Sequence, residues 1–283
     1  MKTKIAIAQI DSKLGDVKEN LSIYKDYIAK AKREYAKLII FPELSLTGYN
    51  LDAHELTTGL NEEIRNSLVE LAEESNKRGI DIIASYPTIG GDEVNDQVNY
   101  ISSAYFTRGF NVGTHHKIYL ADYGHCNDHI TYSPGSEINV IETQFGKIAM
   151  LICEDGWHPT TAVVAAQKGA DIIIDIAATS VVAEEEIKEI EYRWETVSKA
   201  IGLTQTCYFI YANRIGREKN VLFWGGSHVV NPKGEIIKRV ENKEEQLCFF
   251  DFDDQLLEEC RKEMPLVSNE KNTVTMESLS SLK

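Results

Sequence analysis

The sequence predicts an α/β fold of four layers, in which two mixed β-sheets pack on each other and helices cover both outer faces. Short apolar segments alternate with longer segments whose apolar residues recur at helical spacing. In two places, paired strand-like segments follow each other without a helix between them. The order strand, helix, strand, helix, strand and hairpin occurs twice, over residues 4–116 and 147–251. Such alternation places helices outside the sheets, and the two halves can then pack sheet on sheet as an α-β-β-α sandwich.

The first half is expected to contain three single strands, two helices and a hairpin. Short apolar runs predict buried strands at 4–10, 37–41 and 80–86. Apolar residues at helical spacing predict helices over 16–35 and 62–78. A turn that contains Gly109 joins two strand-like segments into a hairpin, at 99–106 and 111–116.

The second half repeats this order of elements without a visible repeat of residues. Strands are expected at 147–152, 171–176, 206–212 and 246–251, and a hairpin at 226–230 and 235–240. Helices are expected at 160–168, 185–201 and 253–263. No linker composition interrupts the chain, so residues 1–264 are expected to form one domain. Residues 265–283 are polar and are expected to form a C-terminal tail.

Composition and charge exclude several classes of protein. The 283 residues have a net charge of −14, and an acidic surface disfavours general binding of nucleic acid. No apolar stretch approaches the roughly 18 residues of a membrane span, and the apolar run 5–10 is too short for a signal-peptide core. The five cysteines are odd in number and scattered, which favours a reducing, cytoplasmic location over a disulfide framework.

Three chemically reactive side chains follow the ends of predicted strands, where α/β proteins commonly place their chemistry. Glu43 comes after an apolar strand and a proline, and it becomes a competent general base if burial raises its pKa. Lys117 ends a hairpin strand and could stabilise a developing oxyanion. Cys153 is the last residue of an apolar run before a sharp turn, where the N–H of Glu154 could join an oxyanion hole.

Each of these residues, taken alone, also has an ordinary structural interpretation. A carboxylate after a strand often caps the following turn, a lysine at a strand end is usually solvated, and a strand cysteine usually packs as a small apolar residue. The functional interpretation therefore depends on all three occurring together and in order.

The three segments around these residues resemble the nitrilase, or carbon–nitrogen hydrolase, superfamily. The matching segments are Phe41-Pro42-Glu43-Leu44-Ser45-Leu46-Thr47-Gly48-Tyr49, His115-His116-Lys117-Ile118-Tyr119-Leu120 and Ile152-Cys153-Glu154-Asp155-Gly156-Trp157-His158-Pro159. The resemblance covers almost the whole chain. It implies the nitrilase-like α-β-β-α sandwich and a catalytic triad of Glu43 as base, Lys117 as oxyanion stabiliser and Cys153 as nucleophile.

The resemblance also implies the chemistry: hydrolysis of a non-peptide amide or N-carbamoyl amine through a thioester on Cys153, with release of ammonia or an amine. It implies residues 1–264 as the hydrolase domain and a homodimer or higher homo-oligomer, in which the tail packs across a neighbouring subunit. A loosely held arm is the alternative for the tail. The expected partner is a small-molecule amide.

The pocket is less well defined by the sequence than the triad. Tyr49 and Trp157 lie beside triad residues in the sequence and are candidate pocket walls, together with Glu154. Many relatives have a second active-site glutamate at the place where this chain has Asp128, whose side chain is one methylene shorter. Asp128 is a candidate to orient Lys117 or the substrate.

No cofactor or metal is expected. His125, Cys126 and His129 lie close together, but their spacing matches no standard zinc pattern, and a polar loop over the active site explains them better. Two other functions remain open: a glutaminase subunit that supplies ammonia to a partner, and a non-catalytic binding module on the same fold. Nitrile hydrolysis is less expected than amide hydrolysis.

Overall fold

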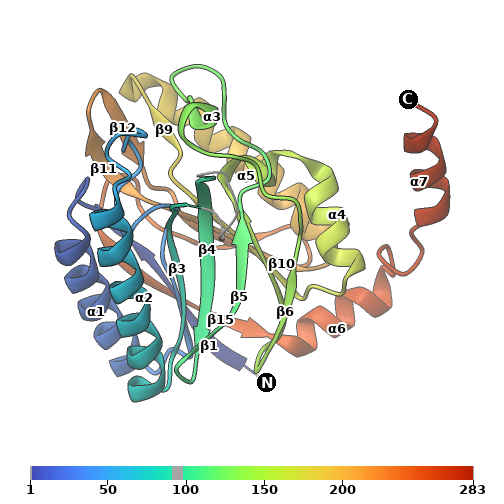
Figure 1. The fold of residues 1–283 in the computed structure, drawn as a ribbon. Helices are drawn as coiled ribbons and strands as arrows, with labels where there is room; N and C mark the ends of the chain where they lie inside the picture. The colour runs from blue at the N-terminus through green and yellow to red at the C-terminus, as the bar shows by residue number, and fades with distance from the viewer. Residues whose placement is uncertain (1, 91–97, 283) are drawn as a thin grey trace.

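The computed structural model describes residues 2–90 and 98–282. It contains two six-stranded mixed sheets that pack face to face, with helices on both outer sides, as the sequence predicts (Figure 1). The predicted fold class is thus confirmed.

The first sheet combines five strands from the first half of the chain with β15, a strand from near its C-terminus. Its order is β15-β1-β2-β3-β4-β5, with bounds Gln246–Asp253, Lys2–Gln9, Leu38–Ile40, Asp81–Thr88, Tyr100–Thr107 and Phe110–His116. Strands β1, β2 and β3 are parallel, and the outer strands pair antiparallel. The helices α1 (Val17–Arg33) and α2 (Thr58–Arg78) lie over its outer face.

The second sheet has the same plan of a parallel centre and antiparallel edges. Its order is β14-β13-β10-β8-β7-β6, with bounds Ile236–Arg239, His228–Val230, Tyr208–Asn213, Ile172–Ala177, Gly146–Ile152 and Val140–Thr143. Strands β7, β8 and β10 are parallel. The helices α4 (Pro159–Gln167) and α5 (Ile187–Thr204) cover its outer face.

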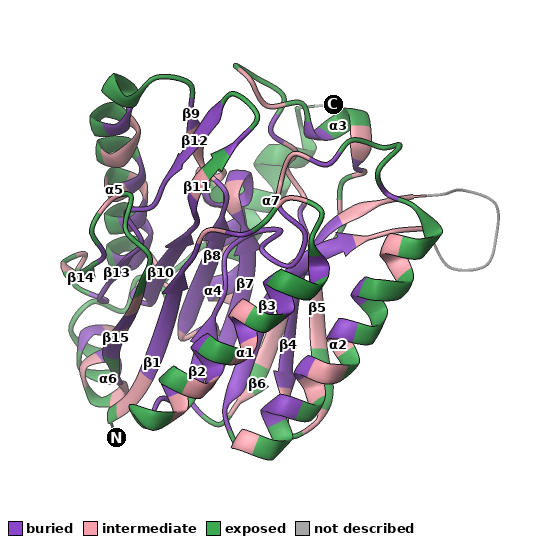
Figure 2. Cartoon of the chain, turned by 90° about the vertical axis from the view of Figure 1, so that its left-hand side faces the viewer, coloured by how far each residue is buried: buried purple, intermediate pink, exposed green. Residues whose placement is uncertain are grey.

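Period-two alternation along the strands separates three apolar layers. In β1, Ile5 and Ile7 enter the core between the two sheets, whereas Ala6 and Ala8 face the helices. In β7, Met150 likewise faces the inter-sheet core, while its neighbours Ala149 and Leu151 face α4 and α5. Successive strand residues point to opposite faces, so each sheet is apolar on both faces and must be covered on both. Figure 2 shows that the strands are mostly buried and that the outer helices are exposed on the side that faces away from the sheets.

Several small elements were not predicted. Strands β11 (Ile215–Glu218), β12 (Val221–Trp224) and β9 (Ser180–Val181) form a third sheet of three short strands. Strand β6 and the helix α3 (Asp128–Thr131) were also missed. The 3₁₀ turns η1 (Cys153–Trp157) and η2 (Glu184–Glu186) lie where a sharp turn after Cys153 and the start of a helix were expected.

The C-terminal segment continues through α6 (Asp254–Glu263) into a further helix, α7 (Asn272–Ser280), which was not predicted. Figure 1 shows α7 standing away from the body of the molecule, and none of its residues is buried. Two hydrogen bonds hold the segment to α4: Gln167 Nε2 donates to the carbonyl oxygen of Val267 at 2.8 Å, and Asn272 Nδ2 donates to Gln167 Oε1 at 2.7 Å. Among the described residues, no helix combines the length and apolar character that a membrane crossing requires.

A buried histidine makes the stability of the fold depend on pH. His228 in β13 lies between the carbonyl oxygen of Gly226 and Ser198 Oγ, at 2.9 and 2.8 Å. Burial lowers its pKa to about 4. The unfolded chain therefore binds more protons than the folded protein between about pH 6.5 and pH 4, and stability falls as the pH is lowered through this window, by up to about 3 kcal/mol.

We expect His228→Gln to reduce this pH dependence. The measurement is urea unfolding of both proteins near neutral pH and near pH 4.5, with the exposed His54→Gln as control. The wild type and the control should lose more stability on acidification than His228→Gln. Equal losses in all three proteins would contradict the assignment to His228.

Candidate active site

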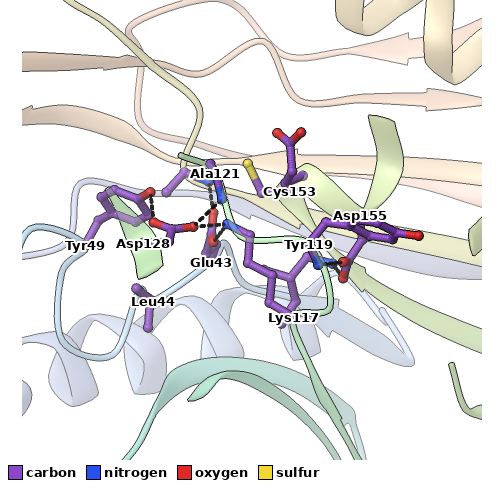
Figure 3. Close-up of polar contacts among 12 residues, drawn as sticks. Glu43, Leu44, Tyr49, Lys117, Tyr119, Ala121, Asp128, Cys153 and Asp155 are labelled. Atoms are coloured by element: carbon purple, nitrogen blue, oxygen red, sulfur yellow. Dashed lines mark hydrogen bonds and ion pairs between the residues drawn. The ribbon is translucent and has the colours of Figure 1, made fainter. Parts of the chain in front are cut away.

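The three residues that follow strand ends in the sequence are brought together at one end of the two sheets. Glu43 follows β2, Lys117 follows β5, and Cys153 follows β7 directly. Lys117 Nζ lies 2.8 Å from Glu43 Oε1. Figure 3 shows the thiol of Cys153 beside this pair. Glu43 and Lys117 follow strands of the first sheet and Cys153 follows a strand of the second, so the packing of the two sheets brings residues more than 100 positions apart into one site.

The carboxylate of Glu43 is fully buried and is held at both oxygens. Oε1 accepts a hydrogen bond from Lys117 Nζ, and Oε2 accepts one from the backbone N–H of Ala178 at 2.7 Å. Burial raises the pKa of Glu43; the charge of Lys117 opposes this, and the charge of Asp128 adds to it. A carboxylate oxygen has two acceptor sites, so each oxygen can still accept a proton from a reacting group.

Lys117 lies between two carboxylates. Its Nζ donates to Glu43 Oε1 and to Asp128 Oδ2, both at 2.8 Å, and the side chain is completely buried. Burial disfavours the ammonium form, but Asp128 and Glu43 outweigh it and raise the pKa of Lys117 well above its usual value. Lys117 is therefore a fixed cation next to the thiol.

The shorter side chain of Asp128 reaches Lys117 because α3 begins at this residue. Asp128 Oδ2 also accepts from the N–H of Ala121 at 3.0 Å, and Tyr49 Oη donates to Oδ1 at 2.5 Å (Figure 3). Tyr49 in turn packs edge-on against Phe223. Asp128 thus orients Lys117 in the structure and is itself oriented by Tyr49 and Ala121.

Cys153 has a left-handed backbone, with φ of +50°. This conformation is unfavourable for a residue with a side chain and occurs often at functional turns. Its Sγ lies 3.8 Å from Thr179 Oγ1. Burial and the charge of Glu43 raise the thiol pKa well above its usual value, against the opposing charge of Lys117. The resting group is therefore a neutral thiol that needs a base.

A cavity of about 330 Å³ opens onto Cys153. Its walls include Tyr49, Glu154 and Trp157, three of the four pocket residues that the sequence suggests. The fourth, Asp128, does not line the cavity and contacts Lys117 instead. Tyr123 Oη donates to Glu154 Oε2 at 2.6 Å, and Trp157 packs edge-on against the buried Trp194. The wall also contains Cys126, and Glu189 and Arg193 of α5, which form an ion pair.

The cluster of His125, Cys126 and His129 does not converge. His125 Nε2 lies 2.8 Å from Ser180 Oγ, whereas His129 Nδ1 pairs with Asp122 at 2.5 Å on the outside of the loop. His125 and Cys126 line the cavity. The loop 121–126 therefore forms one wall of the pocket.

Sequence reasoning missed the residues that β8 and its following segment contribute to the site. These are Asp175, whose carboxylate accepts from the Cys153 N–H, and then Ala178 and Thr179. One signal was available: Asp175 is the only charged residue in the otherwise apolar strand Ile172–Ala177.

Comparison with known proteins agrees with this fold. The carbon-nitrogen hydrolase family model matches residues 4–262. The chain is 29% identical over 269 residues to a probable nitrilase of Schizosaccharomyces pombe, C965.09, and the match covers 89% of each protein. It is 26% identical over 250 residues to the glutamine-dependent NAD(+) synthetase of Acinetobacter baylyi, and here it spans 88% of this chain and 44% of that protein.

The same architecture occurs in a solved carbon-nitrogen hydrolase from Helicobacter pylori G27. The two structures superpose with a TM-score of 0.89 at 21% identity, over 99% of each chain.

The chain belongs to the carbon-nitrogen hydrolase family, the nitrilase superfamily that its motifs resemble. It is an enzyme that hydrolyses carbon–nitrogen bonds of non-peptide amides.

Proposed function

We propose that this protein is a free-standing thiol amidase or N-carbamoyl amine hydrolase that acts on a small molecule, with Cys153 as nucleophile, Glu43 as general base and acid, and Lys117 as oxyanion stabiliser. The observation that supports this most strongly is the buried row of Glu43, Lys117 and Asp128 beside the neutral thiol. Buried charges are costly unless they are paired, and here they lie beside Cys153, which lines the cavity.

The first half of the reaction acylates the enzyme. Glu43 takes the thiol proton of Cys153 as sulfur bonds to the amide carbon, and the carbonyl electrons move onto oxygen. Lys117 and the N–H of Glu154, in the first turn of η1 where helix N–H groups lack internal partners, stabilise this oxyanion. The carbon–nitrogen bond then breaks while Glu43 gives its proton to the leaving nitrogen, which departs as ammonia or an amine.

The second half releases the acid. Glu43 takes a proton from a water molecule whose oxygen bonds to the thioester carbon, and the same donors hold the second oxyanion. The carbon–sulfur bond breaks, and the proton on Glu43 returns to sulfur. Apart from the substrate and this water molecule, these steps use only groups of the chain.

Asp128 is proposed to keep Lys117 charged and aimed at the reacting oxygen. We expect Asp128→Asn to lower kcat about 10- to 100-fold, because it removes a charge that raises the pKa of Lys117. Asp128→Glu is expected to lower kcat as well, since three partners already contact the shorter side chain in a buried site. Asp122→Asn, on the same loop but exposed, is the control. Wild-type kcat in both Asp128 variants would contradict this role.

Ammonia release from a panel of amides tests the proposed function. The panel contains glutamine, short aliphatic amides, N-carbamoyl amines and ω-amides of keto acids. Release by the purified chain alone supports a free-standing enzyme and ranks the substrate classes. Release only after a partner protein is added would favour a glutaminase subunit. No release, together with slow alkylation of Cys153, would favour the non-catalytic binding module.

The proposal extends to assembly and location. We propose residues 1–264 as the hydrolase domain, and residues 265–283 as a tail that packs on a second copy in a homodimer or higher homo-oligomer. The exposed apolar side chains Val274, Met276 and Leu279 of α7 support this role. The five free cysteines support a cytoplasmic location. Light scattering of the full chain and of a chain ending at residue 264 tests the assembly: a monomeric full chain would contradict it.

A further inference from the structure

Asp175 is a buried carboxyl group that the mechanism above does not use. It lies in the centre of β8 with no exposed surface. Its Oδ1 accepts a hydrogen bond from the backbone N–H of Cys153 at 2.7 Å. Its Oδ2 is buried and has no hydrogen-bond partner among the described residues. If Asp175 were ionised, its carboxylate would accept a single hydrogen bond in a fully buried position, and this would cost much free energy of folding.

A second buried carboxyl group, Asp155, lies nearby and has far better partners. Its Oδ1 accepts from the N–H groups of Ile118 and Tyr119, both at 2.9 Å. Its Oδ2 lies 2.8 Å from His115 Nε2 and accepts from the N–H of Ile152 at 3.1 Å. Of two interacting carboxyl groups, the one with more donors keeps the charge and the other keeps the proton. The proton therefore belongs to Asp175, which accepts a single hydrogen bond.

Electrostatics agree with this assignment. Burial raises the pKa of Asp175 well above its usual value, and the charge of Asp155 raises it further; Glu43 acts in the same direction, while Lys117 and the hydrogen bond from Cys153 oppose it. Asp175 also interacts electrostatically with the thiol of Cys153 and with Tyr211 of β10.

The turn that contains Cys153 is fitted closely around Asp175. A Cβ added to Gly156 would lie 1.9 Å from Asp175 Oδ2, so only glycine leaves room for this carboxyl group. Cys153 itself has the left-handed backbone described above, which persists only where its surroundings hold it. The hydrogen bond to Asp175 is the contact that fixes the backbone N–H of this residue.

We propose that Asp175 is a positioning residue, which as a neutral carboxylic acid holds the backbone of Cys153 in its left-handed turn and so aims the thiol at the substrate carbon. The inference rests on the proposed function of Cys153 as nucleophile. An ionised Asp175 would place a further negative charge beside the thiol, near Glu43 and Asp155, and would disfavour the thiolate. The neutral acid provides the acceptor without that charge.

Two variants separate the hydrogen bond from the charge. Asp175→Asn keeps the shape and the acceptor oxygen of the neutral acid, and its amide N–H₂ replaces the acid proton. Asp175→Leu has a similar volume and no acceptor. We expect Asp175→Leu to lower kcat about 100-fold with little change in KM, and Asp175→Asn to restore most of that loss.

The experiment measures alkylation of Cys153 by iodoacetamide against pH, in the absence of substrate, together with kcat and KM. Circular dichroism checks folding, and Cys153→Ala gives the background of the other thiols. In Asp175→Asn, the rate of Cys153 alkylation near neutral pH should follow that of the wild type. In Asp175→Leu, the pH dependence of this rate should differ from that of the wild type. Because alkylation needs no substrate, this result stands apart from any failure to find an amide that is cleaved.

Two outcomes would overturn the proposal. If Asp175→Asn loses alkylation and kcat as far as Asp175→Leu, the charge of Asp175 is required. If Asp175→Leu behaves like the wild type in both measurements, Asp175 positions nothing. Should Asp175→Leu fail to fold, Asp175→Asn alone decides, since a neutral acid predicts its wild-type pH profile and a required carboxylate predicts a changed one.

Discussion

Cys153→Ala is expected to abolish ammonia release, with a fall in kcat of at least ~10⁴-fold. In the proposed mechanism the sulfur is the atom of the chain that bonds to the amide carbon, so neither Glu43 nor Lys117 can replace it. The fold should be retained, because alanine loses one small atom from a residue that borders a cavity. The measurement is steady-state ammonia release with the best amide of the panel, with thermal unfolding alongside.

The control is Cys248→Ala, which removes a thiol of β15 that does not line the cavity. It should keep its kcat and its alkylation at Cys153. Turnover by Cys153→Ala within an order of magnitude of the wild type would contradict the role of this thiol.

Lys117→Met is expected to damage both activity and stability. Methionine has a similar length but no charge, so Glu43 and Asp128 would face each other as buried carboxyl groups without their shared cation. Removing one partner of a buried ion pair costs about 3–5 kcal/mol. The loss of an oxyanion donor alone lowers kcat ~10²- to 10³-fold, and protonation of Glu43 would lower it further.

Urea unfolding and kcat measure the two effects separately. The control is Lys147→Met, a partly exposed lysine of β7 that pairs with Glu142 at 3.5 Å near the surface. It should change neither quantity by much, because surface ion pairs contribute little. A Lys117→Met protein with the stability and kcat of the wild type would contradict the paired arrangement described here.

The layered fold could be predicted from the sequence because strand-like and helix-like segments alternate along the chain. In the structure, Ile5 and Ile7 enter the core between the sheets and Ala6 and Ala8 face the helices, so the first sheet is covered on both faces. The third sheet could not be predicted in this way. Strand β9 has only two residues, which is too short for any period to appear, and it forms only by pairing with β12.

The sequence could predict which reactive residues lie in the site, because each of them follows the end of a strand. Glu43, Lys117 and Cys153 follow β2, β5 and β7, and α/β proteins commonly place their chemistry at such strand ends. The partners of these residues depend on tertiary distances that no local pattern encodes. Whether Asp128 reaches Lys117 depends on where α3 begins, and the role of Asp175 depends on its packing against Gly156.

The central claim is that Cys153 forms a covalent acyl intermediate, and rapid-quench mass spectrometry tests it most directly. Wild-type enzyme is mixed with the best amide of the panel, quenched in acid during the first turnovers and digested, and each cysteine peptide is weighed. If Cys153 is the nucleophile, the acyl mass is expected on the peptide that contains Cys153, and hydroxylamine should remove it, as it does from a thioester. Ammonia release without any acyl mass on that peptide, or with the mass on another cysteine, would contradict it.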